Sequence, residues 1–178
     1  MGGTAARRGE GVPAASVAAM KITEPPRGPE QRKRDVLNRL EEELDVWVAT
    51  ADADGVPCLV ALWFVWDGAD LWLSTRLTNP TGRNLRDGRR ARLAFGATRD
   101  VVLIDGEAET FTAREVPPEA ADAFLARTGW DPREDAASYA YFRVRPRVVQ
   151  AWREVHEMPG RHVMRDGVWV VNQPGINS

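Results

Sequence analysis

Arginine and hydroxyl side chains gather in the segment LWLSTRLTNPTGRNLRDGRRARLAF, residues 71–95. We expect an apolar strand to end at Ser74 and Thr75, and Asn79 followed by Pro80 is typical of a helix start. The first N–H groups of a helix have no partner within it, so together with the helix dipole they bind phosphate. Arginine adds a two-pronged donor that matches phosphate oxygens. The pattern therefore predicts an anion site at this turn.

The residues closest to the helix start are the best placed for this anion. Arg76 and Arg83 lie near it, and Gly82 would let another group approach the backbone closely. The arginines within residues 86–92 could only widen a positive rim. A run of arginines more often covers a solvated helix face and pairs with surface carboxylates. Here the end of a strand, the hydroxyl residues and the start of a helix meet at one place, which favours the anion site over a solvated face.

Composition limits the classes of protein to which the chain can belong. Its 178 residues, 43% of them hydrophobic, can bury one sizeable core. A net charge of -2, and arginines without interleaved aromatic residues at 83–92, argue against nucleic acid as a partner. No apolar run reaches the ~20 residues that span a bilayer. With one cysteine, Cys58, no intramolecular disulfide is possible. We expect a soluble, cytoplasmic protein that has no membrane partner.

The chain divides into a tail and one domain. Residues 1–29 are rich in Gly, Ala, Pro and Arg without a sustained period, which predicts a disordered tail in which Met20 is a candidate native start. Residues 30–178 are expected to form a single domain. It opens with a helix whose apolar residues, from Val36 to Leu44, share one face.

Short strands at close spacing follow this helix. We expect them at DVWVATA, VPCLVALWFVW, LWLST, RARLAFGA, DVVLIDGEAETFTA and YAYFRVRPRVVQAW, with a closing hairpin that turns at Asp166 and Gly167. The second strand is an almost continuous apolar run, which predicts cover on both faces. Helices are expected from Pro118 to Gly129 and after Asp131. The strands, short turns and peripheral helices predict a mainly β barrel rather than a parallel sheet.

Three segments, in this order, resemble the pyridoxamine 5'-phosphate oxidase-like family of FMN-binding split barrels, including its deazaflavin-using branch. They are VPCLVALWFVWDGADLWLST, PTGRNLRDGRRARLAF and VVLIDGEAE. In VRPRVVQAW, the residues Val144, Pro146, Val149 and Trp152 recur at a spacing similar to that of a family strand. The resemblance extends from Glu30 to Trp152.

The resemblance implies a six-stranded antiparallel split β-barrel and a homodimer with two cofactor sites at the subunit interface. The cofactor would be FMN or the deazaflavin coenzyme F-420. Its phosphate would lie at the turn described above, surrounded by Ser74, Thr75, Arg76, Thr81, Gly82, Arg83 and Asn84. Its ring system would lie against the preceding strand, largely through backbone contacts, at Leu62, Trp63 and Phe64.

Two departures from the family pattern bear on this assignment. Many relatives have a lysine where this chain has Thr81, so phosphate binding would depend on Arg76 and Arg83. True vitamin-B6 oxidases have an Arg-Leu-His-x-Arg-like segment near the C-terminus, whereas this chain reads GRHVMRDG with His162 displaced. Pyridoxamine phosphate is therefore not the expected substrate.

Other side chains that could be reactive are better explained by surface or core positions. Glu107 and Glu109 share one strand face, where they could serve acid–base chemistry but are more often solvated. Cys58 lies in an apolar strand and is expected to be a small core residue. His156 and His162 lack partners at metal spacing, so no zinc site is expected, although either could ligate haem, which some family members bind.

Tryptophans alternate along the predicted strands and are expected first of all in the core or at an interface. They are Trp47, Trp63, Trp66 and Trp72. Trp63 has a possible second role beside a flavin.

The expected function is that of an oxidoreductase that transfers hydride to or from a small conjugated substrate. In such a protein the cofactor carries the hydride, and the chain supplies orientation and electrostatics. No catalytic side chain is identified. The arginines slightly favour coenzyme F-420, which has the longer anionic tail, over FMN. The alternative is a non-enzymatic protein that binds or sequesters a flavin or deazaflavin.

Overall fold

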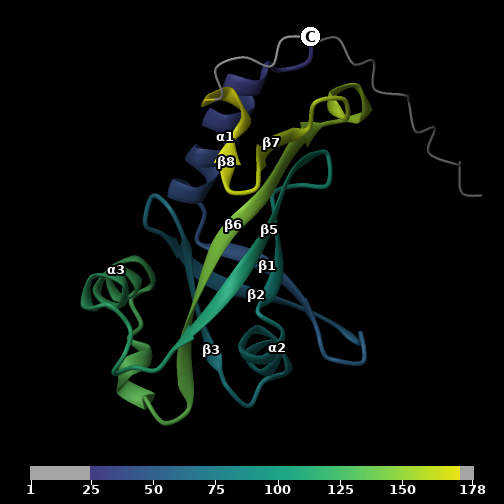
Figure 1. Ribbon diagram of the computed structural model, residues 1–178. Helices are drawn as coiled ribbons and strands as arrows, with labels where there is room; N and C mark the ends of the chain where they lie inside the picture. The colour runs from purple at the N-terminus through teal and green to yellow at the C-terminus, as the bar shows by residue number, and fades with distance from the viewer. Residues whose placement is uncertain (1–24, 173–178) are drawn as a thin grey trace, which may run out of the picture.

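The computed structural model describes residues 25–172 as an antiparallel sheet that closes on itself (Figure 1). Its strands are β1 (Asp45–Ala51), β2 (Pro57–Trp66), β3 (Leu71–Arg76), β4 (Arg90–Phe95), β5 (Asp100–Phe111), β6 (Tyr139–Arg153), β7 (His162–Arg165) and β8 (Val168–Trp169). Its α-helices are α1 (Pro29–Glu42), α2 (Pro80–Gly88) and α3 (Pro118–Thr128). Three short 3-10 helices complete it: η1 (Pro132–Asp135), η2 (Val155–Glu157) and η3 (Val170–Asn172).

Six of the strands form a closed barrel. Their order is β3-β2-β1-β4-β5-β6, and β3 pairs again with β6, from Leu71 opposite Val144 to Arg76 opposite Tyr139. The β7–β8 hairpin extends the sheet beyond β6, and it turns at Asp166 and Gly167, which both have positive φ. The predicted six-stranded antiparallel barrel is confirmed.

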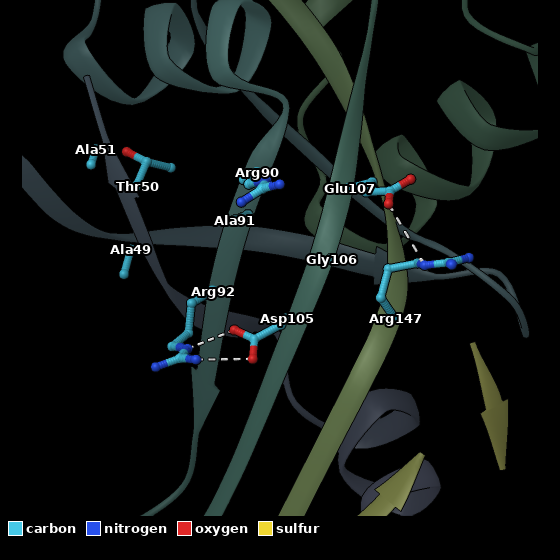
Figure 2. A pocket seen from close by; sticks show the side chains of 10 residues that line it. All are labelled: Ala49, Thr50, Ala51, Arg90, Ala91, Arg92, Asp105, Gly106, Glu107 and Arg147. Atoms are coloured by element: carbon cyan, nitrogen blue, oxygen red, sulfur yellow. Dashed lines mark hydrogen bonds and ion pairs between the residues drawn. The ribbon is translucent and has the colours of Figure 1, made fainter. Parts of the chain in front are cut away.

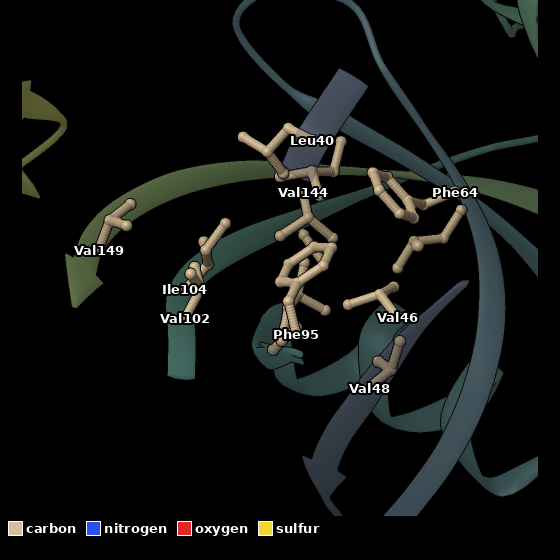
Figure 3. Close-up of a cluster of buried hydrophobic side chains, with 14 of the residues drawn as sticks. Leu40, Val46, Val48, Phe64, Phe95, Val102, Ile104, Val144 and Val149 are labelled. Atoms are coloured by element: carbon tan, nitrogen blue, oxygen red, sulfur yellow. The ribbon is translucent and has the colours of Figure 1, made fainter. Parts of the chain in front are cut away.

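Helices α1 and α2 cover opposite ends of the barrel (Figure 1). The barrel core is formed by alternate residues of the strands, among them Val46, Phe64 and Ile104, which are almost fully buried. Figure 3 shows Leu40 of α1 above this cluster, and Leu85 of α2 belongs to it as well. Each such side chain contributes about 1.5–3 kcal/mol through burial, which is what fixes the two helices on the barrel.

A second apolar cluster lies outside the barrel, under helix α3. Phe124 and Ala121 of α3 pack on Trp72 of β3, Val65 of β2 and Tyr141 of β6. The helix ends as predicted, because Gly129 adopts a left-handed conformation and its N–H donates to the Leu125 carbonyl at 2.8 Å. Strand β3 is consequently buried on both faces.

Strand β2 is predicted to be covered on both faces, and for the outer face of residues 57–63 this is wrong. Leu59 and Trp63 are 60% and 40% exposed, and Trp47 on the neighbouring strand is 53% exposed. Only Phe64 and Val65, near the end of the strand, are buried. Trp130 approaches this outer face at Trp63, whereas Leu59 and Trp47 remain exposed. Val60 and Leu62, on the other face of the strand, pack against the core, so the apolar run combines a core face with an exposed face.

The predicted tail, residues 1–29, falls mainly on residues 1–24, which lie outside the described residues. Within the described part, Arg27 is fixed before α1 begins. Its guanidinium lies 2.7 Å from Glu157 and 2.6 Å from Asp35, and its side chain is 10% exposed. Glu157, 1% exposed, also accepts hydrogen bonds from the backbone N–H groups of Arg27 and Arg153. A buried ion pair therefore holds the chain just ahead of α1.

None of the helices in the described residues is long and apolar enough to cross a membrane.

The pH dependence of stability tests the Arg27–Glu157 pair. Burial raises the pKa of Glu157, but the hydrogen bonds from Arg27 and Arg153 outweigh it and lower the pKa from 4.5 to about 2. The charged carboxylate thus adds roughly 3 kcal/mol of stability above pH ~4.5, and this is lost as the pH falls towards 2. Glu157→Gln should lower the free energy of unfolding by about 2–4 kcal/mol at pH 7, measured by chemical denaturation.

The matched control is Glu109→Gln, which breaks an exposed ion pair with Arg143. It should cost no more than about 1 kcal/mol. Equal losses in the two variants would show that the Arg27–Glu157 pair is no stronger than a surface pair.

Candidate functional site

The end of strand β3 adjoins the start of helix α2, as the sequence predicts. Asn79 occupies the N-cap position and Pro80 begins the helix. The Asn79 side chain makes no capping hydrogen bond, and its amide instead donates to Thr75 Oγ1 at 3.0 Å. Ser74 Oγ donates to the Ala140 carbonyl of β6 at 3.0 Å. Both hydroxyl residues therefore help to hold the turn and the barrel together.

Gly82 lies in the first turn of α2, directly against the backbone of Arg76. A Cβ at Gly82 would be 2.2 Å from the Arg76 carbonyl oxygen and 3.2 Å from the Leu77 Cα. The sequence predicts that Gly82 leaves room for a bound group, but the group that approaches is the chain's own backbone. The glycine is needed for α2 to pack against the end of β3.

Thr81 and Asn84 point from α2 towards strands β1 and β2 and are 2% and 7% exposed. Thr81 Oγ1 lies 3.3 Å from Cys58 Sγ, and the Asn84 amide donates to Thr50 Oγ1 at 3.1 Å. Helical spacing would have indicated this, because Thr81 lies three residues before Asn84 and four before the buried Leu85. Cys58 is partly buried rather than a core residue.

The two arginines predicted for the anion are engaged with other groups. The Arg76 guanidinium lies 4.8 Å above the centre of the Tyr139 ring and 3.7 Å from Asp135. The neighbouring Tyr139 side chain raises the pKa of Arg76. Arg83 is exposed, and its side chain folds back to donate to the Thr78 carbonyl. Each of the two side chains therefore already has a partner within the chain.

A groove of about 500 Å³ opens between β2, β3 and the segment around α3. It contains four of the predicted cofactor-binding residues, Leu62, Trp63, Ser74 and Thr75. Its other lining residues are Asp45, Ala61, Asn79, Phe124, Trp130 and Tyr139. Of the remaining predicted residues, Phe64 points into the barrel, where its ring lies 5.2 Å from that of Phe95.

Aromatic side chains form most of one wall of this groove. The Trp130 ring lies 4.8 Å from Tyr139, 6.2 Å from Phe124 and 6.3 Å from Trp63, in edge-on arrangements. Such rings suit a flat aromatic ligand. The sequence does not mark Trp130, Phe124 and Tyr139 as site residues. The only local signal is that Trp130 follows Gly129, which ends the helix.

A larger hollow, of about 580 Å³, lies on the outer face of β1, β4 and β5 (Figure 2). Its charged side chains are largely neutralised by one another: Arg92 binds Asp105 at 2.6 Å, and Arg147 lies 3.7 Å from Glu107. Glu107 is therefore part of an ion pair, which favours the solvated-face interpretation over acid–base chemistry. We place the candidate site in the aromatic groove instead.

The histidines lie apart from the groove. His156 is in η2 and His162 in β7, and the described lining residues include neither. Burial lowers the pKa of His162. Within residues 25–172, no three His, Cys, Asp or Glu side chains lie together as a metal site.

Comparison with known proteins identifies the family. The family model described as pyridoxamine 5'-phosphate oxidase matches residues 33–166, which is most of the chain. The chain belongs to this family, as the resemblance in its sequence indicates. Among curated proteins, none matches the sequence significantly.

Solved structures share the fold. An F420 reductase is 23% identical, with a TM-score of 0.52 over 63% of this chain and 93% of that chain. A Clostridium acetobutylicum protein related to general stress protein 26, of the pyridoxinephosphate oxidase family, is 17% identical (TM-score 0.52, 71% and 91%). The haem storage protein HutZ from Vibrio cholerae is 15% identical (TM-score 0.55, 68% and 94%). At these identities the likeness shows the fold alone.

A pair of glycine substitutions tests how α2 is seated. Gly82→Ala should lower the free energy of unfolding by about 1–3 kcal/mol, because the new Cβ meets the Arg76 carbonyl. Gly88→Ala, at the other end of the helix, has its nearest neighbour 3.9 Å away and should be neutral or stabilising by up to ~1 kcal/mol. Thermal or chemical denaturation checks both. A neutral Gly82→Ala would mean that α2 does not pack this closely on β3.

Proposed function

We propose that the chain is an oxidoreductase that binds FMN or coenzyme F-420 in the aromatic groove and transfers hydride to or from a small conjugated substrate. The observation that carries the proposal is the groove itself, where Leu62 and Trp63 of β2 face Ser74 and Thr75 of β3. These are the positions to which the family resemblance assigns the cofactor. An F420 reductase among the similar folds supports the deazaflavin as one of the two candidates.

The groove suits the ring system of such a cofactor. Trp63, Trp130 and Tyr139 offer apolar, flat surfaces on which a conjugated ring can rest. Thr75 and Asn79 provide polar groups at one end, and Arg76 lies at the rim above Tyr139. The bound cofactor would supply the hydride chemistry, while these residues bind and orient it.

A homodimer is part of the proposal, because the groove opens beside an apolar surface. Trp47 lies opposite Ala61, and Ala49 opposite Leu59, so these residues share the outer face of β1 and β2. Exposed apolar patches of this kind mark interaction sites. Ala61 and Trp63 belong to both this face and the groove. A second copy seated here would therefore close the groove over its ligand.

The substrate of this proposed enzyme is a small conjugated molecule other than pyridoxamine phosphate, since the C-terminal segment departs from that of the vitamin-B6 oxidases. We also infer a cytoplasmic location, with which the free thiol of Cys58 is compatible.

Cofactor titration tests the proposal directly. The purified full-length protein should bind FMN or coenzyme F-420 with micromolar affinity. Absorbance and fluorescence measure the binding, and mass spectrometry identifies any cofactor that co-purifies. Trp63→Ala should weaken binding by about 1 kcal/mol or more, because Trp63 lines the groove. Trp169→Ala, on β8, is the matched control and should leave affinity unchanged. No binding of either cofactor would remove the proposal, and binding without turnover would favour the sequestering protein.

The dimer has its own test. Leu59→Glu should give a folded monomer, because Leu59 is 60% exposed in the single chain and a buried charge would oppose association. Sedimentation equilibrium measures the oligomeric state, and cofactor affinity should fall with it. Val155→Glu, at an apolar position on η2 that is 73% exposed, is the control. A dimer that survives Leu59→Glu places the interface elsewhere.

A further inference from the structure

A separate hollow, of about 410 Å³, lies between the β2–β3 turn, strand β6 and the β7–β8 hairpin. We call it the hairpin hollow, and its apolar lining residues include Trp66, Pro146, Met164 and Trp169. The two indoles and Met164 also pack against the barrel core, which fixes their positions. Among the described residues, none lines both this hollow and the aromatic groove. Its volume and its indole rings suit a small molecule that contains a flat ring.

Both turns that frame the hairpin hollow are fixed by hydrogen bonds. The Asp67 carboxylate accepts hydrogen bonds from the backbone N–H groups of Ala69 and Asp70, at 2.9 and 2.7 Å. In the β7–β8 hairpin, the Gly167 N–H donates to the Arg147 carbonyl of β6 at 2.9 Å. A frame that is formed before the ligand arrives needs little ordering on binding.

The carboxylate of Asp70 lines the hairpin hollow and is only loosely paired. Its side chain is 10% exposed, yet its oxygens lie 3.4 Å from Arg145 Nε and 3.6 Å from Arg143 Nε. By comparison, Arg92 approaches Asp105 to 2.6 Å on the surface. A carboxylate that has left water normally has close hydrogen bonds, because its desolvation is costly. Asp70 is therefore suited to accept a further hydrogen bond from an ammonium group in the hollow.

Arginines of β6 bring positive charge to the same hollow. Arg145 and Arg147 both line it and are exposed, and Arg147 lies 3.7 Å from its carboxylate partner Glu107. A guanidinium has five N–H donors, so these long contacts leave donors for an anion, and its shape matches a carboxylate. Asp166 at the hairpin turn is the remaining charged lining residue. The hollow thus combines charges of both signs with an aromatic wall.

We propose that the hairpin hollow binds a small aromatic zwitterion, the chemical class to which the aromatic amino acids belong. The ring lies against Trp66 and Trp169, the ammonium group at Asp70, and the carboxylate group at Arg145 and Arg147. An aromatic acid or an aromatic amine would satisfy charges of only one sign. The site goes beyond the proposed function and does not depend on it, because other residues line the cofactor groove.

Titration of the full-length protein with L-phenylalanine, hydrocinnamate and phenethylamine tests the proposal. Hydrocinnamate lacks the ammonium group and phenethylamine lacks the carboxylate. Tryptophan fluorescence and ligand-observed NMR measure binding. L-Phenylalanine should bind with a Kd of ~1 mM or below. It should bind at least about tenfold more tightly than either analogue, because a charged hydrogen bond contributes about that factor or more. A smaller preference over either analogue, or no binding of L-phenylalanine, overturns the proposal.

Two variants assign the charged ends of the ligand. In Asp70→Asn, the preference for L-phenylalanine over hydrocinnamate should disappear, while the preference over phenethylamine persists. Arg145→Gln should reduce only the preference over phenethylamine. Glu109→Gln is the matched control, because Glu109 pairs with Arg143 outside the hollow, and it should leave both preferences unchanged.

Circular dichroism confirms that these variants fold. Their affinity for FMN or coenzyme F-420 should equal that of the unmodified protein, which keeps this test apart from the test of the cofactor groove. A preference over hydrocinnamate that survives in Asp70→Asn would show that Asp70 does not hold the ammonium group, and the proposed site would be wrong.

Discussion

The pairing of β3 with β6 is the interaction on which the rest of this structure depends. Without it, the six strands would form an open sheet with two unpaired edges, which invite association. With it, one face of every barrel strand turns to a shared apolar interior. The same pairing sets Tyr139 at the start of β6 opposite Arg76 at the end of β3. One set of hydrogen bonds thus closes the core and builds a wall of the candidate site.

Packing at the end of the barrel fixes helix α2 beside the groove. Helix α2 must lie close to β3 for Leu85 to reach the core, and this close approach requires Gly82. The helix is then fixed through Thr81 and Asn84, whose polar atoms bind β2 and β1. The side chains of Thr81 and Asn84 therefore serve the packing of the helix, whereas the aromatic rings of the groove are arranged around its open space.

The outer surface of β1 and β2 is only partly covered in the single chain. Helix α3 covers the outer side of β3 and the end of β2, where Trp72 and Val65 are buried. It leaves Leu59 and Trp47 to solvent in the single chain. Alternation along a strand explains this, because residues that point away from a filled barrel need a second layer. The proposed second copy would provide that layer and would cover the groove at the same time.

Local patterns in the sequence predict the strands, a mainly β barrel and the helix boundaries at Pro80 and Gly129, because turns and alternation are short-range properties. The family resemblance added the six-stranded split form of the barrel and the β2 residues of the groove. Tertiary structure alone decided which way the side chains of α2 face and which distant residues join the groove. Trp130 reaches Trp63, and Tyr139 reaches Trp130, only because α3 folds over β2 and β6 closes on β3. Such contacts depend on the whole barrel, and no single segment encodes them.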